Sequence, residues 1–311
     1  MPRKKNKLIP LHVLDEAHRV LEQFPELRGR HDYPEMVKFL DKVGSGHDAP
    51  NLYSECFQAA FGTAWEQSGK QIYTFDFELA HALATQTDLA VAADTLKRLP
   101  FRCGYVQLPK TIRYNGWPAD GFFAYLHDDE LELLVCGANG RWFGRAPVKL
   151  TAKTFAESWA MTENLPGLPT TVPPENANDA GMSVCVQALL YLCAQNADLA
   201  RTSPVPAMAD HPSRDAKQAK KLPVQSWSVG VRVGQTIKAN RRRYERTGGT
   251  SAPHGTHARP RPHLRSGHWS HFWTGKRDSV DRERILKWIE PVYINADGPD
   301  DLPATIHKVE K

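Results

Sequence analysis

Histidine, arginine and tryptophan side chains alternate closely near the end of this 311-residue sequence, between Arg259 and Arg277. Five of the 13 histidines lie within eighteen residues, at positions His254, His257, His263, His268 and His271. Imidazole groups move protons or bind phosphate, guanidinium groups bind phosphate, and indole rings stack on unpaired bases. This mixture predicts contact with a polyanion, most directly RNA.

Two kinds of RNA chemistry fit these residues. A metal-independent ribonuclease needs an acid, a base and a cation on the scissile phosphate, for which His263, His268 and His271 are candidates together with Arg265 or Lys276. Histidine also binds phosphate without catalysis, so the enzymatic alternative stays open. A metal site is not favoured, because there is no HExxH motif and no nearby cysteine. No motif indicates a cofactor.

An extended backbone from Arg261 to Trp273 would place alternate side chains on one face. That face would carry Arg261, His263, Arg265, Trp269, His271 and Trp273. The apolar run from Arg282 to Asn295 then predicts a second strand, joined to the first by a turn over 275–281. The result is a basic β-hairpin. A competing interpretation makes Trp269, Trp273 and Trp288 core aromatics with the arginines around the rim.

The distribution of charge supports a basic C-terminal region. Residues 211–311 hold 20 Lys+Arg and 10 Asp+Glu, against 20 and 25 in residues 1–210, so the net charges are +10 and −5. Clustered cations release counterions from a phosphate backbone. The predicted RNA-contacting residues are Arg241, Arg242, Arg243, Arg259, Arg261, Arg265, Trp269, Trp273, Lys276 and Arg277. A DNA-binding regulator would instead place the predicted helix Gly230–Glu245 in a major groove.

The elements that position these residues follow from apolar periodicity. Helices are predicted from Leu8 to Leu21 and over Tyr33–Val43, Asn51–Trp65 and Asp76–Leu99. Short β-branched and aromatic runs predict antiparallel strands at Cys103–Leu108, Gly121–Leu126 and Leu131–Cys136, with the polar link 127–130 as a hairpin turn. Thr151–Met161 returns to helix, and Asp179–Ala197 predicts a buried apolar helix.

The predicted fold is α+β, with an N-terminal helical layer, central antiparallel strands, and a C-terminal helix followed by the basic hairpin. We predict a helical region over 1–99, a strand-rich region over 100–163, a Pro-rich linker over 164–178, a buried helix over 179–198, a mobile linker over 199–224, and a basic region over 225–311.

Composition excludes several classes of protein. The chain is 41% hydrophobic and 24% charged, as in ordinary globular proteins, and no run approaches the roughly 20 apolar residues of a membrane span. Its five cysteines are widely spaced and mostly lie in apolar runs, which is typical of reduced thiols. We therefore expect a cytoplasmic protein.

The run Arg261-Pro-His-Leu-Arg-Ser-Gly-His-Trp-Ser-His-Phe-Trp-Thr-Gly275, followed by Lys287-Trp-Ile-Glu-Pro-Val-Tyr-Ile-Asn295, resembles the C-terminal signature of phage and plasmid proteins related to the translation-dependent type V-A anti-CRISPR. The resemblance implies recognition of the N-terminal peptide of the type V-A nuclease as it leaves the ribosome, followed by loss of the translated message. The implied partners are that nascent peptide and the mRNA or ribosome.

The residues themselves suggest where a peptide would bind. An exposed strand edge or an aromatic-lined groove captures extended peptides, and Tyr105, Trp117 and Trp142 are candidate lining residues. Aromatic residues of such strands are more often part of a core. The leading hypothesis is therefore a bacterial cytoplasmic protein with a peptide-recognising front part and an RNA-directed tail; the alternative is a ribonuclease or general RNA-binding protein of a mobile element.

Overall fold

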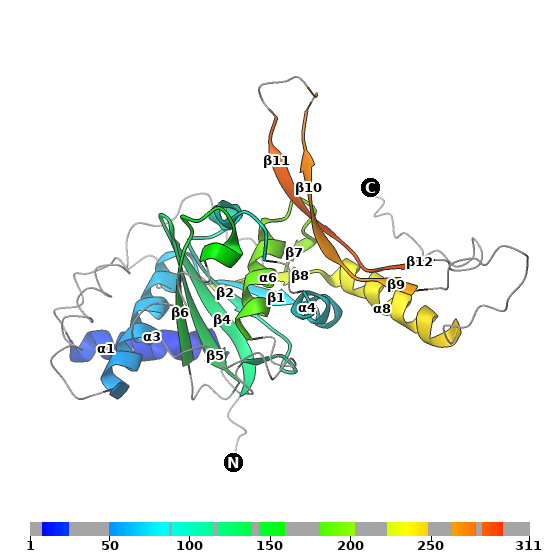
Figure 1. The fold of residues 1–311 in the computed structure, drawn as a ribbon. Helices are drawn as coiled ribbons and strands as arrows, with labels where there is room; N and C mark the ends of the chain where they lie inside the picture. The colour runs from blue at the N-terminus through cyan, green and yellow to red at the C-terminus, as the bar shows by residue number, and fades with distance from the viewer. Residues whose placement is uncertain are drawn as a thin grey trace, which may run out of the picture.

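The chain is built around one mixed β-sheet (Figure 1). The computed structural model describes residues 8–24, 50–86, 89–114, 117–138, 143–158, 181–202, 223–247, 263–275, 277 and 282–294. The sheet contains eight strands, β1 (Gln71–Phe75), β2 (Cys103–Gln107), β3 (Arg113–Tyr114), β4 (Trp117–His127), β5 (Glu130–Gly137), β6 (Phe143–Lys149), β7 (Leu199–Arg201) and β8 (Gln225–Val229). Their order is β6-β5-β4-β2-β1-β8-β7, and β3 pairs with β4.

The centre of the sheet is parallel. Strand β1 runs parallel to both β2 and β8, whereas the outer pairs are antiparallel. Ile72, Tyr73 and Phe75 are all buried, because helices cover both faces of this central strand. Neither β1 nor β8 was predicted from the sequence, since both are short and lie beside segments with stronger helical or linker signals.

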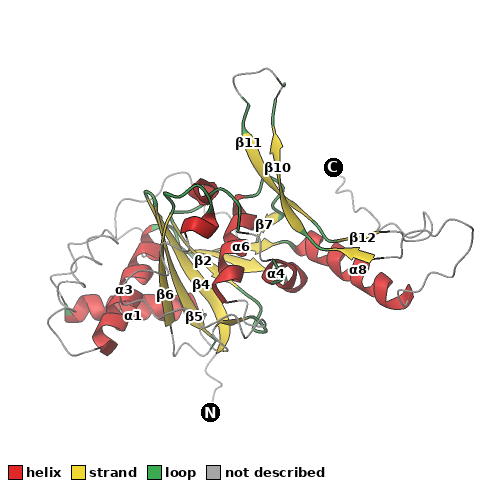
Figure 2. Cartoon of the chain, in the orientation of Figure 1, coloured by secondary structure: helices red, strands yellow, loops and turns green. Residues whose placement is uncertain are grey.

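Alternate side chains of the strands enter two different cores. Tyr105 and Phe123 pack with the helices α1 (Ile9–Gln23) and α3 (Pro50–Gln67), whereas Val106 and Phe122 face the opposite layer. That second layer contains α4 (Phe77–Ala84), the 3₁₀ helix η2 (Ala93–Arg98), the apolar helix α6 (Gly181–Cys193) and α8 (Val231–Thr247). Figure 2 shows these helices on the two sides of the sheet.

The single helix predicted over Asp76–Leu99 is wrong, because the structure has two shorter helices there. Asp76 begins α4 by accepting hydrogen bonds from the backbone N–H groups of Glu78 and Leu79. Thr85, the C-cap of α4, is β-branched and has low helix propensity, and the next described helix, η2, begins at Ala93.

The chain beyond α8 forms a long two-stranded ribbon. We call it the arm, and it contains β9 (His263–Arg265), β10 (His268–Trp273), β11 (Arg284–Ile289) and β12 (Val292–Ile294). Antiparallel pairs join β10 to β11 and β9 to β12. In Figure 1 the β10–β11 part projects from the body, while the β9–β12 part lies along α8. The predicted basic hairpin is thus confirmed.

The α+β fold class is confirmed, and so are the antiparallel strands around Cys103, Gly121 and Leu131 and the buried helix α6. Backbone pairing crosses the predicted region boundaries, because β1, β2 and β8 belong to different regions but lie side by side. Leu199–Arg201, predicted as linker, forms β7. The predicted helix Tyr33–Val43 and the Pro-rich linker 164–178 lie outside the described residues. Within the described part of the chain, no helix is long and apolar enough to cross a membrane.

Candidate nucleic-acid interface

The arm is anchored to the body by two tryptophans that face each other across the strands. Trp269 and Trp288 are register partners with ring centroids 4.9 Å apart, and they are only 8% and 1% exposed. The Trp269 indole donates a 2.6 Å hydrogen bond to Oε1 of Gln187 on α6. Trp269, predicted as a stacking surface for RNA, is therefore a core residue; the competing interpretation was right for this residue and for Trp288.

The free edge of β11 is also bonded to the body. Asn196, just beyond α6, donates from Nδ2 to the Trp288 carbonyl at 2.8 Å, and its Oδ1 accepts from the Trp288 amide at 3.0 Å. The Gln195 amide donates to the Leu286 carbonyl at 3.0 Å. These two residues stand where a third strand would pair, so they fix the direction in which the arm leaves the body.

The predicted continuous strand from Arg261 to Trp273 is interrupted at Ser266-Gly267, which separates β9 from β10. A Cβ atom at Gly267 would lie 2.4 Å from the Trp288 ring, so only glycine fits beside this anchor. The break means that Arg265 of β9 and the alternate side chains of β10 do not belong to one continuous strand face. Within β10, and on β11 beside it, successive side chains still alternate between the two faces of the ribbon.

The projecting end of the arm carries an aromatic–cation pair on each face. Trp273 is 60% exposed and the Arg282 guanidinium lies 5.0 Å from its ring centroid. Phe272 is 42% exposed, with the Lys287 ammonium 5.4 Å from its ring centroid. Because neighbouring residues of a strand point to opposite faces, the two pairs lie on opposite sides of the ribbon. Trp273 is thus the predicted aromatic that remains accessible.

Further cations lie along the arm, Arg277 and Arg284 near this end and Arg265 on β9. Arg265, Arg277 and Arg284 are exposed. The Arg265 guanidinium lies 3.3 Å from Nε2 of His268, and Arg282 donates to the Arg277 carbonyl at 3.0 Å. Arg265 and Arg277 were predicted from the sequence, but Arg282, Arg284 and Lys287 were not, because the apolar residues of their strand dominate its pattern. The net charge of +10 over residues 211–311 was the sequence feature to which these three cations contribute.

The candidate catalytic histidines are not brought together as an acid–base pair. His268 and His271 stand three residues apart on β10, so their imidazoles point to opposite faces. His268 also lies 3.4 Å from the Ser266 carbonyl. The side chain of His263 lies outside the described residues. The strand therefore does not place His268 and His271 on one phosphate.

Helix α8 carries a second set of cations, and one of them, Arg241, forms an ion pair within the fold. Arg241 forms a 2.7 Å ion pair with Glu78 of α4, whose side chain is only 12% exposed, so Arg241 joins the two helices. Lys238 and Arg242 are exposed and stand four residues apart on one face. Like charges at this spacing repel each other mildly and are relieved by an anion. Lys238 was missed in the sequence, where it stands before the arginine cluster.

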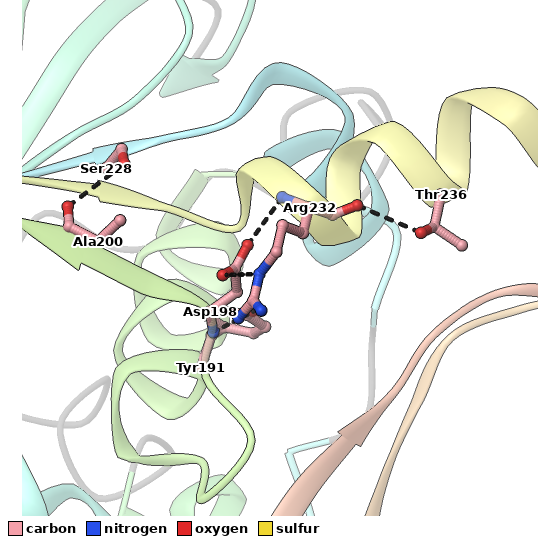
Figure 3. A network of polar contacts seen from close by, with 6 residues as sticks. All are labelled: Tyr191, Asp198, Ala200, Ser228, Arg232 and Thr236. Carbon is pink, nitrogen blue, oxygen red and sulfur yellow. Dashed lines mark hydrogen bonds and ion pairs between the residues drawn. The ribbon is translucent and has the colours of Figure 1, made fainter. Parts of the chain in front are cut away.

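The start of α8 is held by a buried acid (Figure 3). Asp198, 8% exposed, accepts from the Arg232 backbone amide at 2.8 Å and from Arg232 Nε at 2.7 Å. The Asp198 amide in turn donates to the Tyr191 hydroxyl of α6 at 3.1 Å. Asp198 thereby serves as a cap for the first turn of the helix, and it ties the base of α8 to α6.

Several predicted site residues lie outside the described part of the chain. These are Arg259, Arg261, Lys276 and Trp142, together with the side chain of Arg243. They stay predictions. Among the described residues, no group of three or more histidine, cysteine, aspartate or glutamate side chains is arranged to hold a metal ion.

The three predicted peptide-binding aromatics do not form one surface. Tyr105 is fully buried, and its hydroxyl donates a 2.6 Å hydrogen bond to Asp120. Burial raises the pKa of Tyr105 well above its usual value, and the nearby Cys136 and Asp120 add to that shift. Tyr105 is thus a core residue and lines no groove. Trp117, at the start of β4, is 63% exposed and remains a candidate.

Taken together, the fold and the site define an α+β protein that carries a projecting cationic β arm. The chain belongs to the AcrVA2-like family, the anti-CRISPR type V subtype A2 family, which matches residues 73–296. The match extends from the central strand of the sheet through the arm. Family membership supports an anti-CRISPR function.

Individual proteins that are similar to this chain include AcrVA2 and protein FinQ. The crystal structure of AcrVA2 covers 92% of this chain and 95% of its own, with a TM-score of 0.52 and 16% identity, which shows a shared fold. Protein FinQ of Escherichia coli is 27% identical over 131 residues, or 40% of this chain. The chain matches 36% of the length of FinQ, so only about a third of that protein has a counterpart here.

Proposed function

We propose that this protein prevents the production of a type V-A CRISPR nuclease by recognising the nascent N-terminal peptide of that nuclease and triggering loss of the message being translated. Membership of the anti-CRISPR family supports the target, and the exposed cationic arm, which lies within the matched residues, supports contact with the message or ribosome. The single observation that carries the RNA part is the exposed Trp273 with Arg282 against its ring.

The arm suits unpaired RNA for physical reasons. Stacking of a base on an aromatic side chain is worth about 1–3 kcal/mol, and a guanidinium beside the ring meets the adjoining phosphate. The ribbon projects from the body, so an RNA strand can approach both faces. The buried Trp269–Trp288 pair and the Asn196 bonds hold the arm in one direction, which reduces the entropy lost on binding.

Peptide recognition is assigned to the body. Trp117 offers an exposed indole beside the short strand β3, at the opposite end of β4 from His127. Extended peptides bind such surfaces with alternate side chains in pockets and with backbone hydrogen bonds. At the edge strand β6, Pro147 lacks an N–H donor and limits pairing with a further strand. The Trp117 end of β4 is therefore favoured over β6.

The test is capture of the protein from bacterial cells that translate a type V-A nuclease. One message is intact, and a second has its first codons recoded to a different peptide. Enrichment of the intact message alone is the expected result. Equal recovery of both messages, or of neither, would remove nascent-peptide recognition and leave a general RNA-binding protein or ribonuclease of a mobile element.

A further inference from the structure

A surface groove of about 590 Å³ opens on the body between the η2–β2 link and the end of β4. Its apolar lining residues are Leu99, Pro100, Phe101 and Leu126, and its polar lining residues are Lys97, Arg102, His127 and Asp128. This volume lies in the usual range for sites that bind molecules the size of a nucleotide. The groove is formed by residues far from the basic tail in sequence.

The groove adjoins the arm. Arg98 follows Lys97 at the end of η2, and its Nη1 donates to the Arg284 carbonyl of β11 at 3.3 Å. Arg284 is the register partner of Trp273. One hydrogen bond therefore joins the rim of the groove to the strand opposite the exposed indole. A chain molecule lying on Trp273 would reach the groove by passing Arg284 and Arg98.

Charge favours an anion along this path. Lys97, Arg98 and Arg102 are exposed on the body, and Arg277, Arg282 and Arg284 continue the positive charge on the arm. Fewer acids lie on the same described segments: Asp94 on η2, Asp128, Glu283, and Asp129, which is paired with Lys97. Cations therefore outnumber acids along the path.

The groove also presents planar groups. Arg102 and His127 line the groove, and both contact the buried Tyr125 ring: the Arg102 guanidinium lies 5.6 Å from its centroid, and the His127 ring is stacked on it with an interplanar angle of 28°. Arginine and histidine faces accept a stacked base, and Lys97 and Arg102 supply donors to a phosphate. A hydrophobic peptide would contact the apolar lining residues but would bring no anion to Arg102, whereas Lys97 already has Asp129 as a partner.

We propose that this groove binds a nucleotide of the same single-stranded RNA whose neighbouring segment stacks on Trp273, with Lys97 and Arg102 on its phosphate. The inference rests on the proposed contact of the arm with RNA and extends it onto the body. It adds three body cations to the interface and assigns the groove to RNA.

The test compares binding of two fluorescent single-stranded RNAs of mixed sequence, a 5-mer and a 20-mer, to the full chain at several salt concentrations. The variant K97Q/R102Q removes the groove cations, and R19Q/R113Q removes two exposed charges from α1 and β3 as a matched control. We expect the Kd of the 20-mer to rise about tenfold for the groove variant, and its salt slope to fall by about 1.4, since each phosphate contact contributes about 0.7. The 5-mer, held on the arm, should bind almost unchanged.

An unchanged Kd of the 20-mer for the groove variant would overturn the proposal, as would an equal loss for the matched control. Loss of peptide capture in the groove variant, with its RNA binding intact, would also overturn the proposal, because the groove would then be a peptide site. If the wild-type chain binds neither RNA, the arm contact itself fails. If only the groove proposal is wrong, binding of the 5-mer and capture of the intact message stay as predicted. Crosslinking of 4-thiouridine in the 20-mer to residues 99–102 gives an independent readout of position.

Discussion

Replacing Trp273 with alanine should separate RNA binding from folding. The indole is 60% exposed, so little apolar burial is lost, and the exposed contact with Arg282 is worth about 0.5–1 kcal/mol. We therefore expect the free energy of unfolding to fall by less than about 1 kcal/mol. The affinity for single-stranded RNA should fall by about 1–3 kcal/mol, a rise in Kd of roughly 5- to 150-fold.

The assay is fluorescence anisotropy of a labelled RNA 20-mer, with urea denaturation of the same samples. Trp117→Ala is the matched control, because that indole is 63% exposed but lies on the body. It should leave the RNA affinity unchanged. Trp269→Ala should instead destabilise the fold by about 3–5 kcal/mol, as for a buried aromatic. Equal RNA affinities for the wild type and Trp273→Ala would refute the stacking assignment.

Three further changes test how the arm and α8 are held. Asn196→Ala removes both side-chain hydrogen bonds to the Trp288 backbone, and water can reach the exposed Asn196 position. We expect the free energy of unfolding to fall by about 2 kcal/mol and the Trp288 amide to exchange faster, whereas unchanged exchange would contradict the anchoring role. Gly234→Ala would place a Cβ 1.8 Å from Oδ1 of Asp76, so calorimetry should show a melting temperature several degrees lower; an unchanged value would mean that α8 does not pack there. Burial and then the nearby Asp198 raise the pKa of Glu290, so its ionisation opposes folding: the penalty is absent below the unfolded pKa, grows as pH rises from the unfolded to the folded pKa, and is complete above it. Glu290→Gln should therefore stabilise the protein at pH 7 but not at pH 4 in urea titrations.

The sequence was sufficient to predict the two strands of the arm, but not which of their side chains are buried. A two-residue period correctly paired β10 with β11, yet it put Trp269 and Trp273 on the same face and could not tell them apart. Their difference arises from distance along the ribbon, since Trp269 lies against Gln187 of α6 and Trp273 lies beyond the body. That contact joins residues 82 positions apart, which no local pattern contains.

The centre of the sheet and the groove were missed for related reasons. Five-residue strands such as β1 give too short a pattern to be distinguished from a helix end, and β1 is specified by its parallel neighbours β2 and β8. Lys97, Arg98 and Arg102 are unremarkable in a region whose net charge is negative. They become candidate binding residues only in the fold, where the Arg98–Arg284 hydrogen bond holds η2 beside the arm.

The central claim is tested most directly by the half-life of a type V-A nuclease message in bacterial cells that contain this protein. We predict that the intact message decays faster than in cells without the protein, and that a message with recoded N-terminal codons keeps its normal half-life. Equal half-lives for the two messages in the presence of the protein would contradict the account.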